Sequence, residues 1–169
     1  MSNNLSLISI RNFIVRHIFD RPFIWWSAVN FVYKHFLCSV IGIIRDDNNN
    51  ILLLDHKYRP DSFSLPAGWL KKGETPFEAI TREIKEETNF NIKPTRLLSV
   101  GSSKINSHLE FVVEAKYIDG TFAESSEISN YKWVSPSIIK DLKDVYCCSL
   151  NDNGGLNEDN NVSMYTANW

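Results

Sequence analysis

The sequence has few cysteines and no long hydrophobic run, and both shortages exclude classes of protein. Its 169 residues include three cysteines, Cys38, Cys147 and Cys148. An odd number, with two of them adjacent, does not suit a disulfide framework, so we expect reduced thiols in a cytoplasmic protein. No apolar run reaches the roughly 18 residues that a bilayer-spanning helix requires. The first apolar stretch, residues 5–10, also lacks the preceding positive charge of a signal peptide. We therefore expect a soluble protein.

The net charge is also small, −2 at neutral pH. It provides no basic field that would favour sequence-independent binding to nucleic acid, so we expect no nucleic-acid partner. The chain does contain 43% hydrophobic and 12% aromatic residues, which is typical of a globular protein. Its length suits one domain with a substantial core.

Composition divides the chain into three zones. Residues 1–36 are apolar, aromatic and mildly basic, with stripes at helical spacing, and we expect a helical extension that packs on the core or on a second copy in a homodimer. The alternatives are an amphipathic element on a membrane surface, a strand, or disorder. Residues 37–146 alternate strand and helix signals. Residues 147–169 are rich in Asn, Asp and Gly, and we expect a loosely ordered tail.

The middle zone predicts an α/β fold. Its strand signals are residues 36–44, 51–58, 95–103, 108–118 and 131–134. The first two are joined by a turn cluster from Asp46 to Asn50 and predict a hairpin. Residues 135–144 predict a helix, with Ser135 as N-cap and Pro136 at the first helical position. With the helix described next, these signals predict a mixed sheet sandwiched between helices.

A central helix is predicted from Pro76 to Thr88. Thr75 suits the N-cap, and Glu78 three residues later completes a capping box. Asn89 follows as a residue able to adopt the left-handed conformation that ends helices.

This helix gathers negative charge on one side. Phe77, Ile80 and Ile84 form an apolar stripe along the helix. Glu83, Glu86 and Glu87 lie at positions i, i+3 and i+4 and occupy an arc of roughly 100° at the edge of this stripe. Like charges at this spacing repel by a few tenths of a kcal/mol. Arg82 flanks the same side and could hold a carboxylate through a forked pair of hydrogen bonds. Taken alone, the cluster is better explained as the charged surface of an ordinary solvated helix.

The surrounding pattern resembles the Nudix box, G-x5-E-x7-R-E-U-x-E-E-x-G-U, where U is a bulky apolar residue. The one departure is Asn89, where the family usually has glycine, and asparagine tolerates the same backbone conformation. The resemblance extends over roughly residues 37–145. The box positions are occupied by Gly68, Glu74, Arg82, Glu83, Ile84, Glu86, Glu87 and Phe90.

Membership of this family implies the Nudix fold and hydrolysis of a nucleoside diphosphate linked to another moiety. It implies Mg²⁺ or Mn²⁺, hard cations that prefer oxygen ligands and activate water. Glu127 is a further ligand or a general base, and the carbonyl of Gly68 is another possible ligand. The candidate metal ligands are Gly68, Glu83, Glu86, Glu87 and Glu127. The candidate catalytic residues are the same four glutamates together with Arg82, which would orient them.

Candidate substrate contacts surround the box. Lys71, Lys72 and Arg59 could bind phosphate, although each is equally consistent with a solvated position. Trp69, Tyr58 and Phe63 could stack on a base, or serve the core or a sheet edge. His56 and His108 have no partner at metal-binding spacing, and we interpret both as structural or surface residues.

The substrate class stays broad. The residues LPAG and YRP favour nucleotide sugars or ADP-ribose, whereas SKINSHLEF beyond the box has no subfamily marker. One alternative is a Nudix-fold module that senses a nucleotide without cleaving it, but such modules usually have a degraded box. Another is capped RNA, which the acidic net charge disfavours.

Overall fold

A computed structural model describes residues 35–58, 63–136 and 163–167. The chain divides into two compact units, Met1–Phe36 and Leu37–Trp169, and the second holds nearly all of the described residues. The predicted helical extension and its membrane or dimer contacts, the body of the predicted second helix, Arg59, Cys147 and Cys148 lie outside the described residues. Within the described ranges, no helix combines the length and the hydropathy needed to cross a bilayer.

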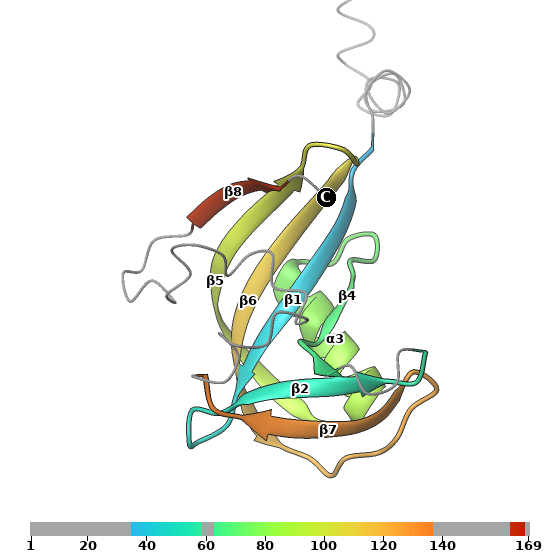
Figure 1. Cartoon of the computed structure of the whole chain (residues 1–169), viewed down its shortest axis with the longest axis vertical. Helices are drawn as coiled ribbons and strands as arrows, with labels where there is room; N and C mark the ends of the chain where they lie inside the picture. Colours follow the sequence, from blue (N-terminus) through green and yellow to red (C-terminus); the bar gives the residue numbers. More distant parts are fainter. Residues whose placement is uncertain (1–34, 59–62, 137–162, 168–169) are drawn as a thin grey trace, which may run out of the picture. The chain divides into compact units, whose positions relative to one another are not determined.

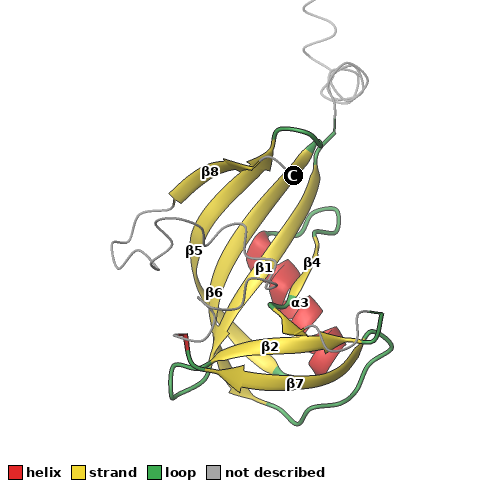
Figure 2. Ribbon diagram, viewed as in Figure 1, coloured by secondary structure: helices red, strands yellow, loops and turns green. Residues whose placement is uncertain are grey.

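The described part of the second unit is a mixed eight-stranded sheet with one helix, α3 (Pro76–Thr88), packed against it (Figures 1 and 2). The strand order is β3-β2-β1-β6-β5-β8, while β4 pairs with β1 and β7 with β2. The β1–β6 and β5–β8 pairs are parallel and the others are antiparallel. This arrangement confirms the α/β class. The strands are β1 (Leu37–Arg45), β2 (Ile51–His56), β3 (Phe63–Ser64), β4 (Ala67–Trp69), β5 (Asn91–Ser103), β6 (His108–Asp119), β7 (Ile128–Val134) and β8 (Ser163–Ala167).

The predicted hairpin is present. Its two strands pair at Arg45 and Ile51, and β1 then pairs with β4 instead of β2. The side chain of Asp46 accepts hydrogen bonds from the backbone N–H groups of Asn48 (2.9 Å) and Asn50 (2.7 Å), which closes the turn. Beyond the pairing of Arg45 with Ile51, β1 takes β4 as its antiparallel neighbour. Residues 67–69 are thereby fixed beside residues 39–41, and the start of the Nudix box is built into the sheet.

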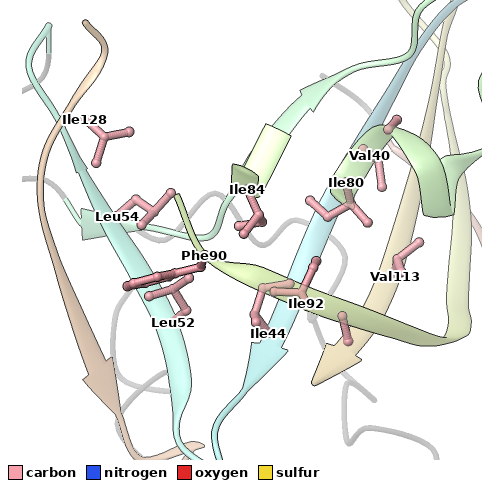
Figure 3. Packing of buried hydrophobic residues seen from close by; sticks show 12 residues of the cluster. Val40, Ile44, Leu52, Leu54, Ile80, Ile84, Phe90, Ile92, Val113 and Ile128 are labelled. Atoms are coloured by element: carbon pink, nitrogen blue, oxygen red, sulfur yellow. The ribbon is translucent and has the colours of Figure 1, made fainter. Parts of the chain in front are cut away.

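Both faces of β1 and β2 are buried, which explains their nearly continuous apolar sequences. On one face, Ile80 and Ile84 of α3 pack against Val40, Ile44 and Val113 (Figure 3). A second cluster on alternate strand positions includes Ile41, Ile43, Leu53, Leu65 and Val112. The predicted helical stripe is correct at Ile80 and Ile84. Phe77 is 38% exposed, however, and Ala79 is buried in its place.

Two strands begin earlier than the sequence pattern indicates. β5 begins at Asn91 rather than Thr95, and β7 at Ile128 rather than Tyr131. Both early segments are held by pairing with a neighbour, Asn91 with Asp119 of β6 and Ile128 with His56 of β2. Cross-strand pairing of this kind is a tertiary effect that local alternation does not reveal.

Residues 163–167 lie in the tail for which the sequence predicts loose order. This segment forms β8 and pairs in parallel with Ser99–Ser103 of β5. The sequence Ser-Met-Tyr-Thr-Ala contains strand-favouring residues, and the edge of β5 offers unpaired backbone groups that an added strand satisfies. The high Asn, Asp and Gly content of the tail as a whole led to a prediction of loose order, and this short strand was not recognised within it.

Candidate active site

The predicted caps of α3 are all present. The Thr75 hydroxyl accepts a hydrogen bond from the Glu78 amide (3.3 Å), and the Glu78 carboxylate accepts one from the Thr75 amide (2.8 Å). At the other end, Asn89 adopts the left-handed conformation with φ of 64°, and its amide donates to the Lys85 carbonyl. Because both ends are fixed, the glutamates of the last turns are held on a rigid element.

Arg82 joins the loop before α3 to the glutamates on the helix. Its Nε and Nη2 donate to the two carboxylate oxygens of Glu74, at 2.7 and 3.0 Å. Its Nη1 lies 2.8 Å from Glu83 and 3.1 Å from Glu86. These contacts suit the predicted orienting role. The forked pair, however, is made with Glu74, for which the sequence predicted no role beyond its place in the box.

The charge of Glu74 is stabilised by these contacts. Hydrogen bonding to Arg82, followed by the bond from the Lys71 amide, lowers the pKa of Glu74 to about 2. Glu74 therefore stays ionised and keeps its hold on Arg82 throughout the neutral range.

Gly68 leaves the space that Glu83 occupies. A Cβ added at Gly68 would lie 2.2 Å from the carboxylate carbon of Glu83, far inside van der Waals contact. Any other residue would displace that carboxylate, which explains why a glycine and a glutamate fifteen positions apart belong to one motif.

Glu87 is the most unusual carboxylate of the cluster. It is only 7% exposed, and within the described part of the chain its Oε2 has no hydrogen-bond partner. Burial, followed by the negative charges of Glu83, Glu127 and Glu86, raises the pKa of Glu87 to about 8. An ionised Glu87 thus lacks a compensating positive charge.

Glu86 is more exposed and lies between two cations. Lys71 Nζ is 3.4 Å from Glu86 Oε1, and Arg82 contacts the other oxygen. Partial burial raises the pKa of Glu86, but the bonds from Arg82 and Lys71 outweigh this effect and the net pKa is lowered. Lys71 therefore lies at the glutamate cluster, while Lys72 is exposed.

A cleft of about 520 Å³ adjoins the cluster. Its lining includes the predicted site residues Gly68, Trp69, Glu83, Glu87 and Glu127. The predicted stacking residue Tyr58 also lines it. The lining within the described ranges does not include Phe63, whose ring lies under Lys132 Nζ at 3.8 Å. Phe63 therefore fits the alternative interpretation, in which it serves the core or a sheet edge and does not stack on a base.

The interpretation of both histidines as structural or surface residues is incomplete, because His56 and His108 line the cleft. His108 Nε2 lies 2.8 Å from the hydroxyl of Ser39, and its ring centroid is 5.4 Å from that of Trp69. The ring of His56 is 5.1 Å from that of Tyr58. The sequence did not predict that either histidine lines the cleft. His56 ends β2 and His108 begins β6, and these strands are brought to the cleft by the fold.

The donor chemistry suits a divalent cation, although the carboxylates are engaged elsewhere. In the described ranges, no three His, Cys, Asp or Glu side chains are grouped so as to hold a metal ion as they stand. Arg82 contacts one carboxylate oxygen of Glu83 and one of Glu86. The buried oxygen of Glu87 and the repulsion around it nonetheless fit an added positive charge.

Comparison with known proteins decides the family. A sequence model of the NUDIX domain matches residues 36–146, well over half of the chain. The chain belongs to the Nudix family. The crystal structure of a NUDIX hydrolase from Nitrosomonas europaea superposes with a TM-score of 0.64 at 21% identity, covering 81% of each chain. This likeness supports the Nudix fold.

Two relatives carry different names. The chain is 47% identical over 74 residues to an ADP-ribose pyrophosphatase of Methanocaldococcus jannaschii, covering 43% of each protein. It is 26% identical over 114 residues to an NAD-capped RNA hydrolase, NudC, of Vibrio atlanticus, covering 67% of this chain and 42% of the relative. The chain thus spans less than half the length of either relative.

Proposed function

We propose that this Nudix protein is a metal-dependent pyrophosphohydrolase that cleaves the diphosphate linkage of a nucleoside diphosphate joined to another moiety. The observation that carries the proposal is Glu87, a buried carboxylate that faces a cleft with other glutamates around it and no compensating charge. ADP-ribose and nucleotide sugars are the first substrates to test, and a relative named ADP-ribose pyrophosphatase supports that choice.

The residues divide the work as follows. Glu83, Glu86 and Glu87, with the carbonyl of Gly68, hold Mg²⁺ or Mn²⁺. The bound cation offsets the charge of the diphosphate and lowers the pKa of a water molecule. Glu127 lines the same cleft and acts as a further ligand or as the acceptor of the water proton.

The remaining residues bind and position. Arg82 holds Glu83 and Glu86 before the cation arrives, and Lys71 lies close enough to Glu86 to contact a phosphate there. Trp69 offers an exposed ring to the substrate. Lys72 and Arg59 remain candidates for contacting phosphate.

Replacing single glutamates tests this function. Glu86→Gln and Glu87→Gln keep the size of the side chain but remove the charge that a hard cation requires. We expect kcat with Mg²⁺ to fall by about 100-fold or more in each, and calorimetric titration to show weaker Mg²⁺ binding. Glu124→Gln is the matched control, since Glu124 pairs with Lys57 at an exposed position. Turnover that is unchanged in both variants would contradict the metal assignment.

A substrate panel separates the alternatives. Purified protein with Mg²⁺ or Mn²⁺ is incubated with ADP-ribose, nucleotide sugars, dinucleoside polyphosphates and nucleoside triphosphates. Binding without cleavage of any of these would favour the nucleotide-sensing module instead. An NAD-capped RNA belongs on the panel, because a second relative carries that name.

A further inference from the structure

The segment that carries Glu127 has little packing of its own. Residues 120–127 connect β6 to β7, and Glu127 is the last of them (Figure 1). All of them except Phe122 and Ser125 are exposed. A segment with few buried contacts is held mainly by its hydrogen bonds. The position of the Glu127 carboxylate at the cleft therefore depends on the bonds that hold this backbone.

Lys57, which directly follows β2, bonds to this segment at three positions. Its backbone amide donates to the carbonyl of Glu127 at 2.8 Å. Its ammonium group donates to the carbonyl of Ser125 at 2.7 Å and pairs with the carboxylate of Glu124, also at 2.7 Å. One residue thus contacts three of the last four positions before β7.

Ser125 connects the ammonium group of Lys57 to the backbone of Glu127. Its hydroxyl accepts from the amide of Ile128 at 3.0 Å and from that of Glu127 at 3.4 Å. Its own amide donates to the carbonyl of Ile128 at 3.1 Å. The turn from Ser125 to Ile128 is therefore closed by its own hydrogen bonds. A cation fixed at the Ser125 carbonyl consequently restrains Glu127 as well.

The beginning of the same segment is bonded to the end of α3, the helix that carries the other glutamates. The amide of Ala123 donates to the carbonyl of Thr88 at 3.1 Å. The side-chain amide of Asn89 donates to the carbonyl of Thr121 at 3.2 Å. The segment is thus held by the helix at its beginning and by Lys57 at its end.

We propose that Lys57 is a positioning residue for Glu127, and that its ammonium group holds the backbone of residues 124–127 so that the Glu127 carboxylate faces the cleft. The proposal rests on the pyrophosphohydrolase function proposed above, in which Glu127 is a further metal ligand or accepts the proton of water. Exposed ion pairs such as that of Lys57 with Glu124 contribute little to stability. A displacement of about 1 Å in an active site, in contrast, can lower the rate about 100-fold. Loss of the ammonium group should therefore affect turnover more than folding.

Lys57→Met tests the proposal, because methionine keeps much of the apolar stem and removes the donors. With Mg²⁺ and the substrate that the parent protein cleaves fastest, kcat of the full chain should fall about tenfold. KM should change little, since Lys57 holds Glu127 and not the substrate. Lys57→Arg retains donors for the Ser125 carbonyl and the Glu124 carboxylate and should recover most of the kcat. An unchanged kcat in Lys57→Met would overturn the proposal.

A double-mutant cycle with Glu127→Gln shows whether Lys57 acts through Glu127. Glu127→Gln removes the charge that Lys57 is proposed to position, and it should itself lower kcat. In that background Lys57→Met should have almost no further effect. The same tenfold loss in both backgrounds would show that Lys57 acts on another group, and the proposal would be wrong.

Hydrogen exchange of the metal-free protein measures the backbone contact without reference to activity. The amide of residue 57 is protected by its bond to the Glu127 carbonyl. It should exchange about tenfold faster in Lys57→Met than in the parent protein, and at nearly the parent rate in Lys57→Arg. Equal exchange in all three proteins would contradict the proposed hold on the segment.

Glu124→Gln is the matched control, because it removes the ion pair and leaves the bond from Lys57 to the Ser125 carbonyl. It should change neither kcat nor the exchange of residue 57. If Lys57→Met does not fold, Ser125→Ala loosens the same turn from the other side of the bond. Its kcat should also fall only where Glu127 is intact, and an unchanged kcat would overturn the proposal.

The outcomes separate this proposal from the function on which it rests. A slow Glu127→Gln with a fully active Lys57→Met would refute the role of Lys57 alone. A fully active Glu127→Gln would refute the role of Glu127 and with it that of Lys57, while the glutamates of α3 keep theirs. No cleavage of any substrate on the panel by the parent protein would refute the hydrolase function as well.

Discussion

At the scale of single residues, Glu74 controls how strongly Arg82 holds the glutamates of the helix. Arg82 has a fixed set of donors, and Glu74 takes the forked pair formed by Nε and Nη2. This leaves mainly Nη1 for Glu83 and Glu86. If the proposed cation binds these carboxylates, Glu74 limits the competition between Arg82 and that cation.

The substitution Glu74→Gln tests this positioning role. Without the charge of Glu74, Arg82 should pair more closely with Glu83 and Glu86, so that Mg²⁺ must displace a stronger partner. We expect the Mg²⁺ concentration for half-maximal activity to rise about tenfold, as for other residues that support metal ligands. KM for the nucleotide at saturating Mg²⁺ should change little.

Glu78→Gln provides the matched comparison, because Glu78 lies in the same helix but bonds to the N-cap instead of Arg82. That variant should reduce thermal stability without altering the Mg²⁺ requirement. An unchanged Mg²⁺ requirement in Glu74→Gln would show that Arg82 does not compete for the site.

The sequence predicted some residues of the site and missed others. The spacing of the Nudix box singled out Gly68 and Glu83 as candidate site residues. The structure places them close together, because a Cβ at Gly68 would overlap the Glu83 carboxylate. His108 and Ser39 gave no such signal. They are 69 positions apart and meet only because β1 and β6 pair in parallel.

At the scale of elements, the end of α3 is fixed by Asn89 in two ways. Its left-handed backbone, with φ of 64°, ends the helix directly after the glutamates. Its side-chain amide also donates to the Thr121 carbonyl at 3.2 Å, which links α3 to the segment between β6 and β7. A glycine, usual for the family at this position, would supply only the first of these.

Asn89→Gly and Asn89→Ala separate these two contributions. Both variants lose the bond to Thr121, but only alanine also carries the strain of the left-handed conformation. We expect Asn89→Ala to be less stable than Asn89→Gly by about 1 kcal/mol, measured as free energy of unfolding in urea. Equal stabilities would mean that the backbone conformation at residue 89 relaxes on substitution.

At the scale of the whole sheet, Glu114 links three strands. Its two carboxylate oxygens accept from Arg45 of β1 at 2.8 Å and from Arg96 of β5 at 2.7 Å. The Glu114 side chain is only 15% exposed. Burial raises its pKa, but the bonds from Arg45 and Arg96 outweigh burial, and the net pKa is lowered.

This arrangement predicts a loss of stability in acid. Because folding lowers the pKa of Glu114, the unfolded state binds the proton more readily. The stabilisation is complete above the ordinary pKa of 4.5 and is lost as the pH falls through the lower folded value. Glu114→Gln should therefore be less stable than the parent protein by about 1–3 kcal/mol at neutral pH, and the difference should shrink on acidification.

Urea unfolding of both proteins across this pH range measures the effect. Glu124→Gln is the control, because the exposed pair of Glu124 with Lys57 contributes little to stability. A difference between Glu114→Gln and the parent protein that stays constant with pH would exclude the linkage.

By itself, the sequence determined the features that depend on neighbours along the chain. These include the hairpin turn at Asp46, the caps of α3, and the placement of Glu83, Glu86 and Glu87 on one side of the helix, because a helix repeats every 3.6 residues. The fixed spacing from Gly68 to Phe90 also predicted the family, which the match over residues 36–146 confirms.

Only the tertiary structure decided which distant residues meet in the cleft. Trp69, His108 and Ser39 come together because β1 pairs with both β4 and β6. Tyr58 and Glu127 line the same cleft, and the backbone N–H of Lys57, the residue before Tyr58, donates to the carbonyl of Glu127. The same holds for β8, which was concealed by the composition around it and is ordered by the edge of β5. Strand pairing joins residues without regard to their separation in sequence, so local patterns cannot record it.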